Sequence, residues 1–153
     1  MTVPEMTSGE SFAPLVRSVE VAADRANAFA LFTDRIAEWW PVDGHSVFGE
    51  GASVGFEDGA VVERHGDRAT TWGEVLEWDP PRTFTMTWHP GHDATESTEV
   101  TVSFHEERPG RTRVQLVHTG WERRTPDVRS SYAQGWTRVL GRYAHVAGVS
   151  PGS

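Results

Sequence analysis

The fold is decided by residues 125–148, TPDVRSSYAQGWTRVLGRYAHVAG. Thr125-Pro126-Asp127 places a capping hydroxyl, a proline at the first helical position and an acid together, which is typical of a helix start. Apolar residues then recur at helical spacing and form one stripe; they are Tyr132, Trp136, Val139, Leu140, Tyr143 and Ala147. We expect one long amphipathic helix that ends near Ala147, with Gly148 as its stop. Gly135 lies inside it at a cost of about 1 kcal/mol, which a close neighbour would explain.

Upstream of this helix, apolar and polar residues alternate in short runs. The clearest run places Phe84, Met86 and Trp88 against threonines, a pattern typical of a half-buried strand. Similar runs lie around residues 15–21, 54–56, 60–64, 72–78, 100–104 and 114–118. Turn signals such as Asp79-Pro80-Pro81-Arg82 separate them, and consecutive strands joined by short turns favour an antiparallel sheet.

Two short helices are expected between the first strand and the rest of the sheet. Asp24 is placed to cap a helix over residues 25–32, and Thr33 or Asp34 a second one that ends before Pro41. The order predicts an α+β fold, a curved antiparallel sheet of about six or seven strands around one long C-terminal helix. We expect residues 1–13 to be a disordered arm and residues 14–149 to form one domain.

Composition excludes several classes of function. The net charge is −8, which argues against nucleic-acid binding. Cysteine is absent, and all fourteen basic residues are arginine, so disulfides, thiolate metal sites and a Schiff-base lysine are excluded. No secretory signal or membrane span is evident, which makes the cytoplasm the expected location. The histidines of His89-Pro90-Gly91-His92-Asp93 suggest a metal site, but no third ligand stands at a telling offset, and we expect neither metal nor cofactor.

Seven tryptophans in 153 residues are the most unusual feature of the composition. Large aromatic side chains build cores, but they also line pockets for apolar ligands, and both interpretations are open. The strand and helix stripes place one set of side chains toward the space between sheet and helix. These candidate ligand-binding residues are Phe32, Trp39, Trp40, Trp72, Met86, Trp88, Phe104, His118, Trp121, Tyr132, Trp136 and Leu140.

Two titratable residues share the expected inward faces of strands. His118 has the parity of Val114 and Leu116, and Glu74 has that of Trp72 and Leu76. A buried imidazole can be a general base or a ligand anchor, or a core histidine satisfied by a backbone carbonyl or a tryptophan N–H. Burial should lower the pKa of His118 below about 6.5 unless a carboxylate such as Glu74 lies beside it. Together they are the candidate catalytic pair.

Several pieces of the sequence, in this order and spacing, match one known family. They are Ala28–Thr33, Glu38–Pro41, Gly73–Arg82 with Thr87-Trp88, Val117–Trp121 and Tyr132–Leu140, which together span about residues 15–148. With these pieces and its element order, the chain resembles the START/SRPBCC superfamily, and in particular it is similar to stand-alone bacterial proteins related to the C-terminal domain of the activator of heat-shock protein 90 ATPase. The resemblance implies the helix-grip fold and a hydrophobic cavity, but superfamily members range from lipid, sterol and hormone binders to cyclases and hydroxylase subunits.

Three functions therefore stay open. The first is binding of a small apolar or aromatic molecule in the cavity. The second is a polyketide cyclase or dehydratase type of enzyme, in which His118 and Glu74 transfer protons. The third is a co-chaperone acting on a heat-shock ATPase, which is less expected because the sequence matches one domain only and lacks the partner-binding N-terminal domain. A homodimer is a further expectation.

Overall fold

The computed structural model describes residues 13–41, 46–90, 97–121 and 126–149. Their elements follow the predicted order of strand, short helices, strands and long helix. The elements are β1 (Leu15–Val21), α2 (Arg25–Phe32), η1 (Ile36–Glu38), β2 (Ser53–Glu57), β3 (Ala60–His65), β4 (Arg68–Asp79), β5 (Thr83–Trp88), β6 (Thr98–Arg108), β7 (Arg111–Thr119) and α3 (Pro126–Val149). The predicted α+β helix-grip fold is confirmed.

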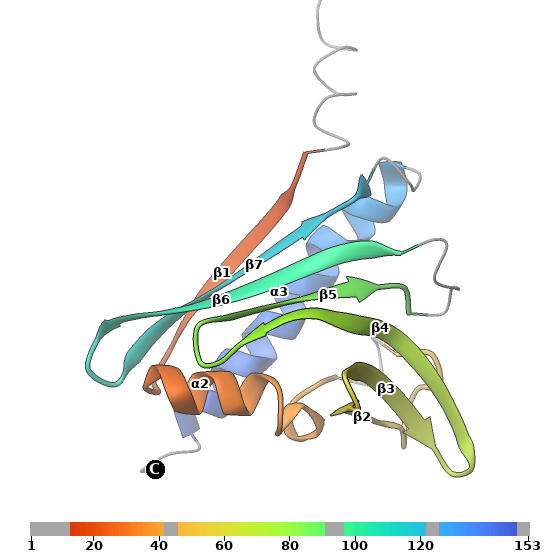
Figure 1. Cartoon of the computed structure of the whole chain (residues 1–153), viewed down its shortest axis with the longest axis horizontal. Helices are drawn as coiled ribbons and strands as arrows, with labels where there is room; N and C mark the ends of the chain where they lie inside the picture. The colour runs from red at the N-terminus through yellow and green to blue at the C-terminus, as the bar shows by residue number, and fades with distance from the viewer. Residues whose placement is uncertain (1–12, 42–45, 91–96, 122–125, 150–153) are drawn as a thin grey trace, which may run out of the picture.

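The strands form one antiparallel sheet in the order β1-β7-β6-β5-β4-β3-β2. Every neighbouring pair is antiparallel, and only β1 pairs out of sequence, with β7. Figure 1 shows α3 running along one face of the sheet, behind the strands in that view, with α2 near the C-terminal end of α3. Aromatic rings from α3 and from the sheet meet between them, as in the contact of Trp136 with Trp88 at 5.2 Å between ring centroids.

The short helix α2 forms as predicted. The Asp24 carboxylate accepts a hydrogen bond from the backbone N–H of Asn27 at 2.8 Å, which satisfies one of the free donors of the first turn. Thr33 ends this helix instead of starting the next one, because its hydroxyl donates back to the Phe29 carbonyl at 2.8 Å. The second predicted helix is accordingly a single 3₁₀ turn, η1, preceded by Arg35.

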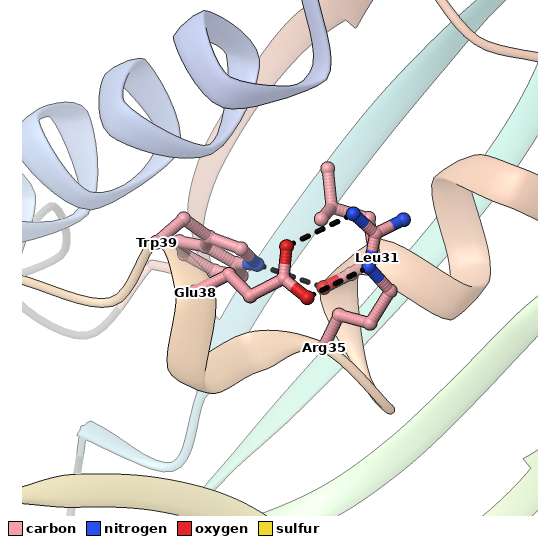
Figure 2. Close-up of polar contacts among 4 residues, drawn as sticks. All are labelled: Leu31, Arg35, Glu38 and Trp39. Carbon is pink, nitrogen blue, oxygen red and sulfur yellow. Dashed lines mark hydrogen bonds and ion pairs between the residues drawn. The ribbon is translucent and has the colours of Figure 1, made fainter. Parts of the chain in front are cut away.

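Two sets of contacts hold η1 in place (Figure 2). The guanidinium of Arg35 donates two hydrogen bonds of 2.9 Å to the Glu38 carboxylate on the outside, an exposed pair that stabilises the turn only slightly. The Nε1–H of Trp39 donates to the Leu31 carbonyl at 2.8 Å. Trp39 is therefore fixed in the core, where it contacts Tyr143, while the next residue, Trp40, contacts Trp72 in another part of the interior.

The α2 end of the interior is a closed aromatic core. The ring of Phe32 lies 5.9 Å from Phe84, 6.0 Å from Phe104 and 5.0 Å from Tyr143 between ring centroids. The Tyr143 hydroxyl donates to the Ala28 carbonyl at 2.7 Å, and burial raises the pKa of Tyr143 well above its usual range. This core joins α2, the sheet and α3 at one end.

Strand β4 departs from simple alternation at two bulges. In its pairing with β3, Gly73 is opposite Val61 and Thr71 is opposite Val62, so that Trp72 has no partner. A side chain on Gly73 would collide with the Thr87 carbonyl oxygen, so glycine is required beside the bulge. Bulges redirect side chains, and this one leaves Trp72 buried.

The bulges overturn the predicted face of β4. A second shift in the pairing with β5 lies between Val75 and Glu77. Glu74 is exposed and Leu76 is 53% exposed, whereas the prediction had both inward with Trp72. After the second shift Trp78 is again on the inward face, opposite Phe84 and 5.7 Å from its ring centroid, although it is 46% exposed. A bulge adds one residue to one strand, and one extra residue reverses the faces of the residues that follow.

The long helix carries the predicted stripe. Trp136, Val139, Leu140, Tyr143 and Ala147 are buried, and Tyr132 packs against the core. The expected stop at Gly148 is wrong, because α3 continues through it to Val149. The expected cap, Thr125, and most of the expected disordered arm lie outside the described residues.

Candidate functional site

A pocket of about 320 Å³ opens between α3 and the sheet. Aromatic side chains come to it from four places in the chain: the segment just after η1, where Trp40 lies, and β4, β5 and α3. Its described lining consists of Trp40, Ser46, Val47, Trp72, Trp88, Pro90, Tyr132, Gly135, Trp136 and Val139. Such a wall, apolar and aromatic with a few polar groups, is typical of small-molecule sites.

The four tryptophan rings of the pocket contact one another. The Trp40 ring centroid lies 5.1 Å from Trp72, 6.0 Å from Trp88 and 6.0 Å from Trp136. Trp88 in turn lies 5.6 Å from Trp72 and 5.2 Å from Trp136. Rings in mutual contact support each other's orientation, so the aromatic wall is preorganised.

The candidate ligand-binding residues separate into two groups. Five of the twelve line this pocket: Trp40, Trp72, Trp88, Tyr132 and Trp136. The other seven are buried but do not line it: Phe32, Trp39, Met86, Phe104, His118, Trp121 and Leu140. The predicted space between sheet and helix therefore contains an open pocket in one part and tightly packed side chains in the other.

His118 is fully buried and takes part in a directed chain of hydrogen bonds. The Nε1–H of Trp136 donates to His118 Nδ1 at 2.9 Å, and because an indole nitrogen only donates, Nδ1 accepts. His118 Nε2 therefore carries the ring proton and donates to Thr98 Oγ1 at 2.6 Å, and that hydroxyl donates to the Trp88 carbonyl at 3.2 Å. This arrangement matches the interpretation of His118 as a core histidine satisfied by a tryptophan N–H.

The candidate catalytic pair of His118 and Glu74 does not form. Glu74 is exposed on β4, whereas His118 is buried on β7, and β5 and β6 lie between these strands. Three strand spacings amount to about 14 Å, well beyond hydrogen-bond reach. The inward orientation predicted for Glu74 is wrong because the bulge at Trp72 changes the parity of β4.

One buried titratable residue was missed by sequence reasoning. Glu63 on β3 is fully buried, and its carboxylate accepts hydrogen bonds from Val47 N–H, Phe48 N–H and Trp72 Nε1–H at 2.8, 2.8 and 3.0 Å. The alternation of Val61 with Glu63 on β3 is the signal that could have found it.

The remaining lining residues were missed for simpler reasons. Ser46, Val47 and Pro90 come from irregular segments, whose course no periodicity predicts. Gly135 is the costly glycine of the helix, and its position in the pocket lining gives it a use, because it adds no side chain to that wall.

Trp88 carries an unpaired donor. Its side chain is 3% exposed, and its Nε1–H has no hydrogen-bond partner in the described structure. The corresponding groups of Trp72 and Trp136 donate to Glu63 and His118. A buried donor without a partner costs about 1–3 kcal/mol, so this position beside the pocket is one where an acceptor on a ligand would add stability.

Features outside this pocket also bear on function. A second hollow of about 390 Å³, lined by Asp34, Phe56, Asp58, Gly59, Val75 and Trp78, lies beside the exposed part of β4. Within the described ranges, no three His, Asp or Glu side chains gather as metal ligands would, and the predicted loop residues His92 and Asp93 lie outside those ranges. None of the described helices has an apolar stretch of the length that crossing a membrane requires.

Comparison with known proteins gives a family and several relatives. Residues 22–148 match the family described as "Activator of Hsp90 ATPase homolog 1-like protein". No curated protein matches the chain in sequence. Among solved structures, the anthrahydroquino-γ-pyrone synthase Txn09 is 30% identical, with a TM-score of 0.57 over 87% of this chain and 96% of that chain.

Two further structures resemble the chain. The self-sacrificing resistance protein CalC from Micromonospora echinospora is 25% identical, with a TM-score of 0.61 over 92% of this chain and 99% of that one. Aha1 from Colwellia psychrerythraea, solved as a dimer, is 15% identical, with a TM-score of 0.67 over 92% of this chain and 99% of that one. The last likeness concerns the fold alone.

Proposed function

The chain belongs to the activator of Hsp90 ATPase homolog 1-like family, and from the pocket of this member we propose that it binds a flat, largely apolar aromatic molecule with oxygen acceptors. The observation that carries the proposal is the set of four tryptophan rings around one pocket of about 320 Å³. Flat aromatic ligands gain both buried area and ring contacts on such walls. The similarity to an anthrahydroquino-γ-pyrone synthase supports the same ligand class.

The size of the pocket narrows the ligand further. Small-molecule pockets measure about 300–1,000 Å³, and this one lies near the lower limit. A compact molecule of a few fused rings suits that volume better than a sterol or a long-chain lipid. Calorimetric titration with alizarin, a flat three-ring quinone, tests the proposal. We expect saturable binding at one site, and binding of a fatty acid without any binding of alizarin would contradict it.

The unpaired Nε1–H of Trp88 supports a ligand that carries oxygen acceptors. This group is shielded from solvent and has no partner among the described residues, so a ligand oxygen within hydrogen-bond distance of it would satisfy an unpaired donor. Trp88→Phe should weaken binding of 1,4-naphthoquinone by about tenfold and leave binding of naphthalene within about twofold of its original value. The chain has no cysteine or lysine for the quinone to modify. Equal losses of affinity for both ligands would refute a hydrogen bond between a ligand oxygen and Trp88.

A ring-forming enzyme is the second candidate. It is favoured by the 30% identity to a synthase. The pair first considered, His118 with Glu74, does not form. His118 does not line the pocket, but it accepts a hydrogen bond from Trp136, which does. Incubation with an o-hydroxyaryl 1,3-diketone, which closes to a γ-pyrone with loss of water, tests this function. The enzyme function would be supported if the protein accelerates ring closure and if His118→Ala removes this acceleration while the variant stays folded. Ring closure at the uncatalysed rate would leave binding as the function.

Other expectations stay predictions. Residence in the cytoplasm, formation of a homodimer and action on a heat-shock ATPase each need their own experiment. Sedimentation velocity measures the oligomeric state, and a pull-down with a purified heat-shock ATPase tests the third function.

A further inference from the structure

A chain of hydrogen bonds runs from one tryptophan of the pocket to another. It begins at Trp136 Nε1–H on α3, which donates to His118 Nδ1 on β7 at 2.9 Å. His118 Nε2–H donates to Thr98 Oγ1 on β6 at 2.6 Å, and the Thr98 hydroxyl donates to the Trp88 carbonyl on β5 at 3.2 Å. Trp136 and Trp88 line the pocket, whereas His118 and Thr98 are buried and do not. Two buried residues outside the lining therefore connect two residues within it.

The direction of this chain is fixed at both ends. An indole nitrogen can only donate and a carbonyl oxygen can only accept, so each group between them has one role. The opposite tautomer of His118 would leave two hydrogens facing each other at Trp136. In a buried site, hydrogen bonds in such a chain polarise and strengthen one another. The Trp136 N–H therefore has one defined acceptor, His118 Nδ1.

Ring contacts do not by themselves select the orientation of Trp136. Its ring centroid lies 5.2 Å from Trp88, 6.0 Å from Trp40 and 6.3 Å from Tyr132, and such contacts depend mainly on the outline of the ring. Turning the indole over about its bond to Cβ keeps much of this contact but moves the N–H away from His118. Both polar groups would then be buried without a partner, which is costly. The bond to His118 is therefore the interaction that distinguishes the two orientations.

We infer that His118 is a positioning residue, which holds the Trp136 ring in the orientation that a ligand in the pocket meets. This inference rests on the proposed function. Because its N–H is engaged, Trp136 offers the ligand ring carbon atoms, while the Nε1–H of Trp88 has no partner among the described residues. A ring that is already held in place loses less entropy when it contacts a ligand. The bond should therefore add to the affinity even of naphthalene, which has no acceptor.

Two substitutions of His118 separate this hydrogen bond from packing. In His118→Asn the amide lies near the position of Nδ1, so its oxygen can accept from Trp136. In His118→Gln the amide lies near the position of Nε2, where it can donate to Thr98 but leaves no acceptor for Trp136. Both variants lose the imidazole ring, whose centroid lies 4.1 Å from that of Trp121 and 5.0 Å from that of Tyr132. Asparagine is the smaller replacement and leaves the larger cavity.

We expect His118→Gln to weaken naphthalene binding by about tenfold and His118→Asn by about threefold or less in calorimetric titrations. Packing alone predicts the opposite order, because its cost rises with the volume of the cavity. Equal losses, no loss in either variant, or a larger loss in His118→Asn would therefore overturn the inference.

A change in Trp136 itself keeps the inference testable if a histidine variant does not fold. Trp136→benzothienylalanine keeps the fused ring system but has sulfur in place of the N–H, so the ring contacts stay and the bond to His118 is lost. Naphthalene affinity should fall by about tenfold. Unchanged affinity in this variant would overturn the inference.

Hydrogen exchange of the indole separates this inference from the proposed function, because it needs no ligand. The Trp136 N–H should exchange slowly in the unmodified protein and in His118→Asn, and much faster in His118→Gln, while backbone amides of β6 and β7 keep their protection. Equal exchange of this hydrogen in the two variants would overturn the role of His118. Failure of both naphthalene and alizarin to bind the unmodified protein would refute the proposed function, and the exchange rates would still decide whether His118 holds Trp136.

Discussion

Filling the pocket from α3 separates ligand binding from fold stability. Gly135 lines the pocket, so Gly135→Leu places a branched side chain where a ligand would lie. Gly141→Leu is the matched control, since Gly141 is in the same helix and is exposed, and a Cβ at this position would meet nothing within 4 Å apart from its chain neighbours and the helix's own backbone.

The magnitudes follow from helix propensity and buried area. Replacing a helical glycine by leucine should stabilise α3 by about 0.8 kcal/mol in both variants, which raises the melting temperature by about 2–3 °C. In Gly135→Leu the new side chain takes apolar contacts worth about 1.5–3 kcal/mol from the ligand, so affinity should fall about 10- to 150-fold. Gly141→Leu should bind as the unmodified protein does.

Circular dichroism melting and calorimetric titration with alizarin measure both quantities. A large loss of stability in Gly135→Leu alone would mean that the space is filled and the leucine overpacks it. A gain in stability with unchanged affinity would mean that the ligand lies elsewhere. Either result would refute the reasoning. A larger side chain in place of the buried Leu140 would not test this reasoning, because Leu140 does not line the pocket.

Three further predictions concern groups around the pocket and core. Trp136→Ala should destabilise the protein by about 3–5 kcal/mol in urea unfolding, because it removes a buried ring and the N–H bonded to His118, and a loss below about 1 kcal/mol would contradict the assigned helix face. Nitrogen-15 NMR should show His118 with its proton on Nε2, and a proton on Nδ1 would contradict the bond from Trp136. Since burial raises the pKa of Tyr143, the folded state keeps the phenol proton above about pH 10, where the unfolded chain loses it. Stability should therefore fall by up to about 1.4 kcal/mol per pH unit above that value, and Tyr143→Phe should remove this slope.

Much of the fold was predictable because local patterns and global packing agree. The cap at Asp24, the alternation in β5 and the stripe on α3 each need only neighbouring residues for their interpretation. The prediction failed in β4, where pairing with neighbouring strands introduces bulges that interrupt the alternation of inward and outward residues. The bulge at Trp72 depends on how β4 meets two neighbouring strands, and Gly73 beside it is the local residue that indicates a bulge.

The site was predictable in composition but not in extent. Aromatic stripes placed the pocket between sheet and helix, yet the division between pocket and core depends on how α2 and η1 pack. Phe32 and Trp39 fill one end with Tyr143, which leaves the open space to Trp40 and its neighbours. Glu63 was missed because two of its three partners are backbone N–H groups, which any sequence could supply, and the third is the indole of Trp72 on another strand.

The indole N–H signals of the seven tryptophans give the most direct test of a ligand in this pocket. Four of these residues, Trp40, Trp72, Trp88 and Trp136, line it, whereas Trp39, Trp78 and Trp121 do not. In proton–nitrogen correlation spectra titrated with alizarin, we predict saturable shifts of the first four signals and small or no shifts of the other three. A saturable shift of Trp78 alone, which lines the second hollow, or no saturable shift at all, would contradict the account.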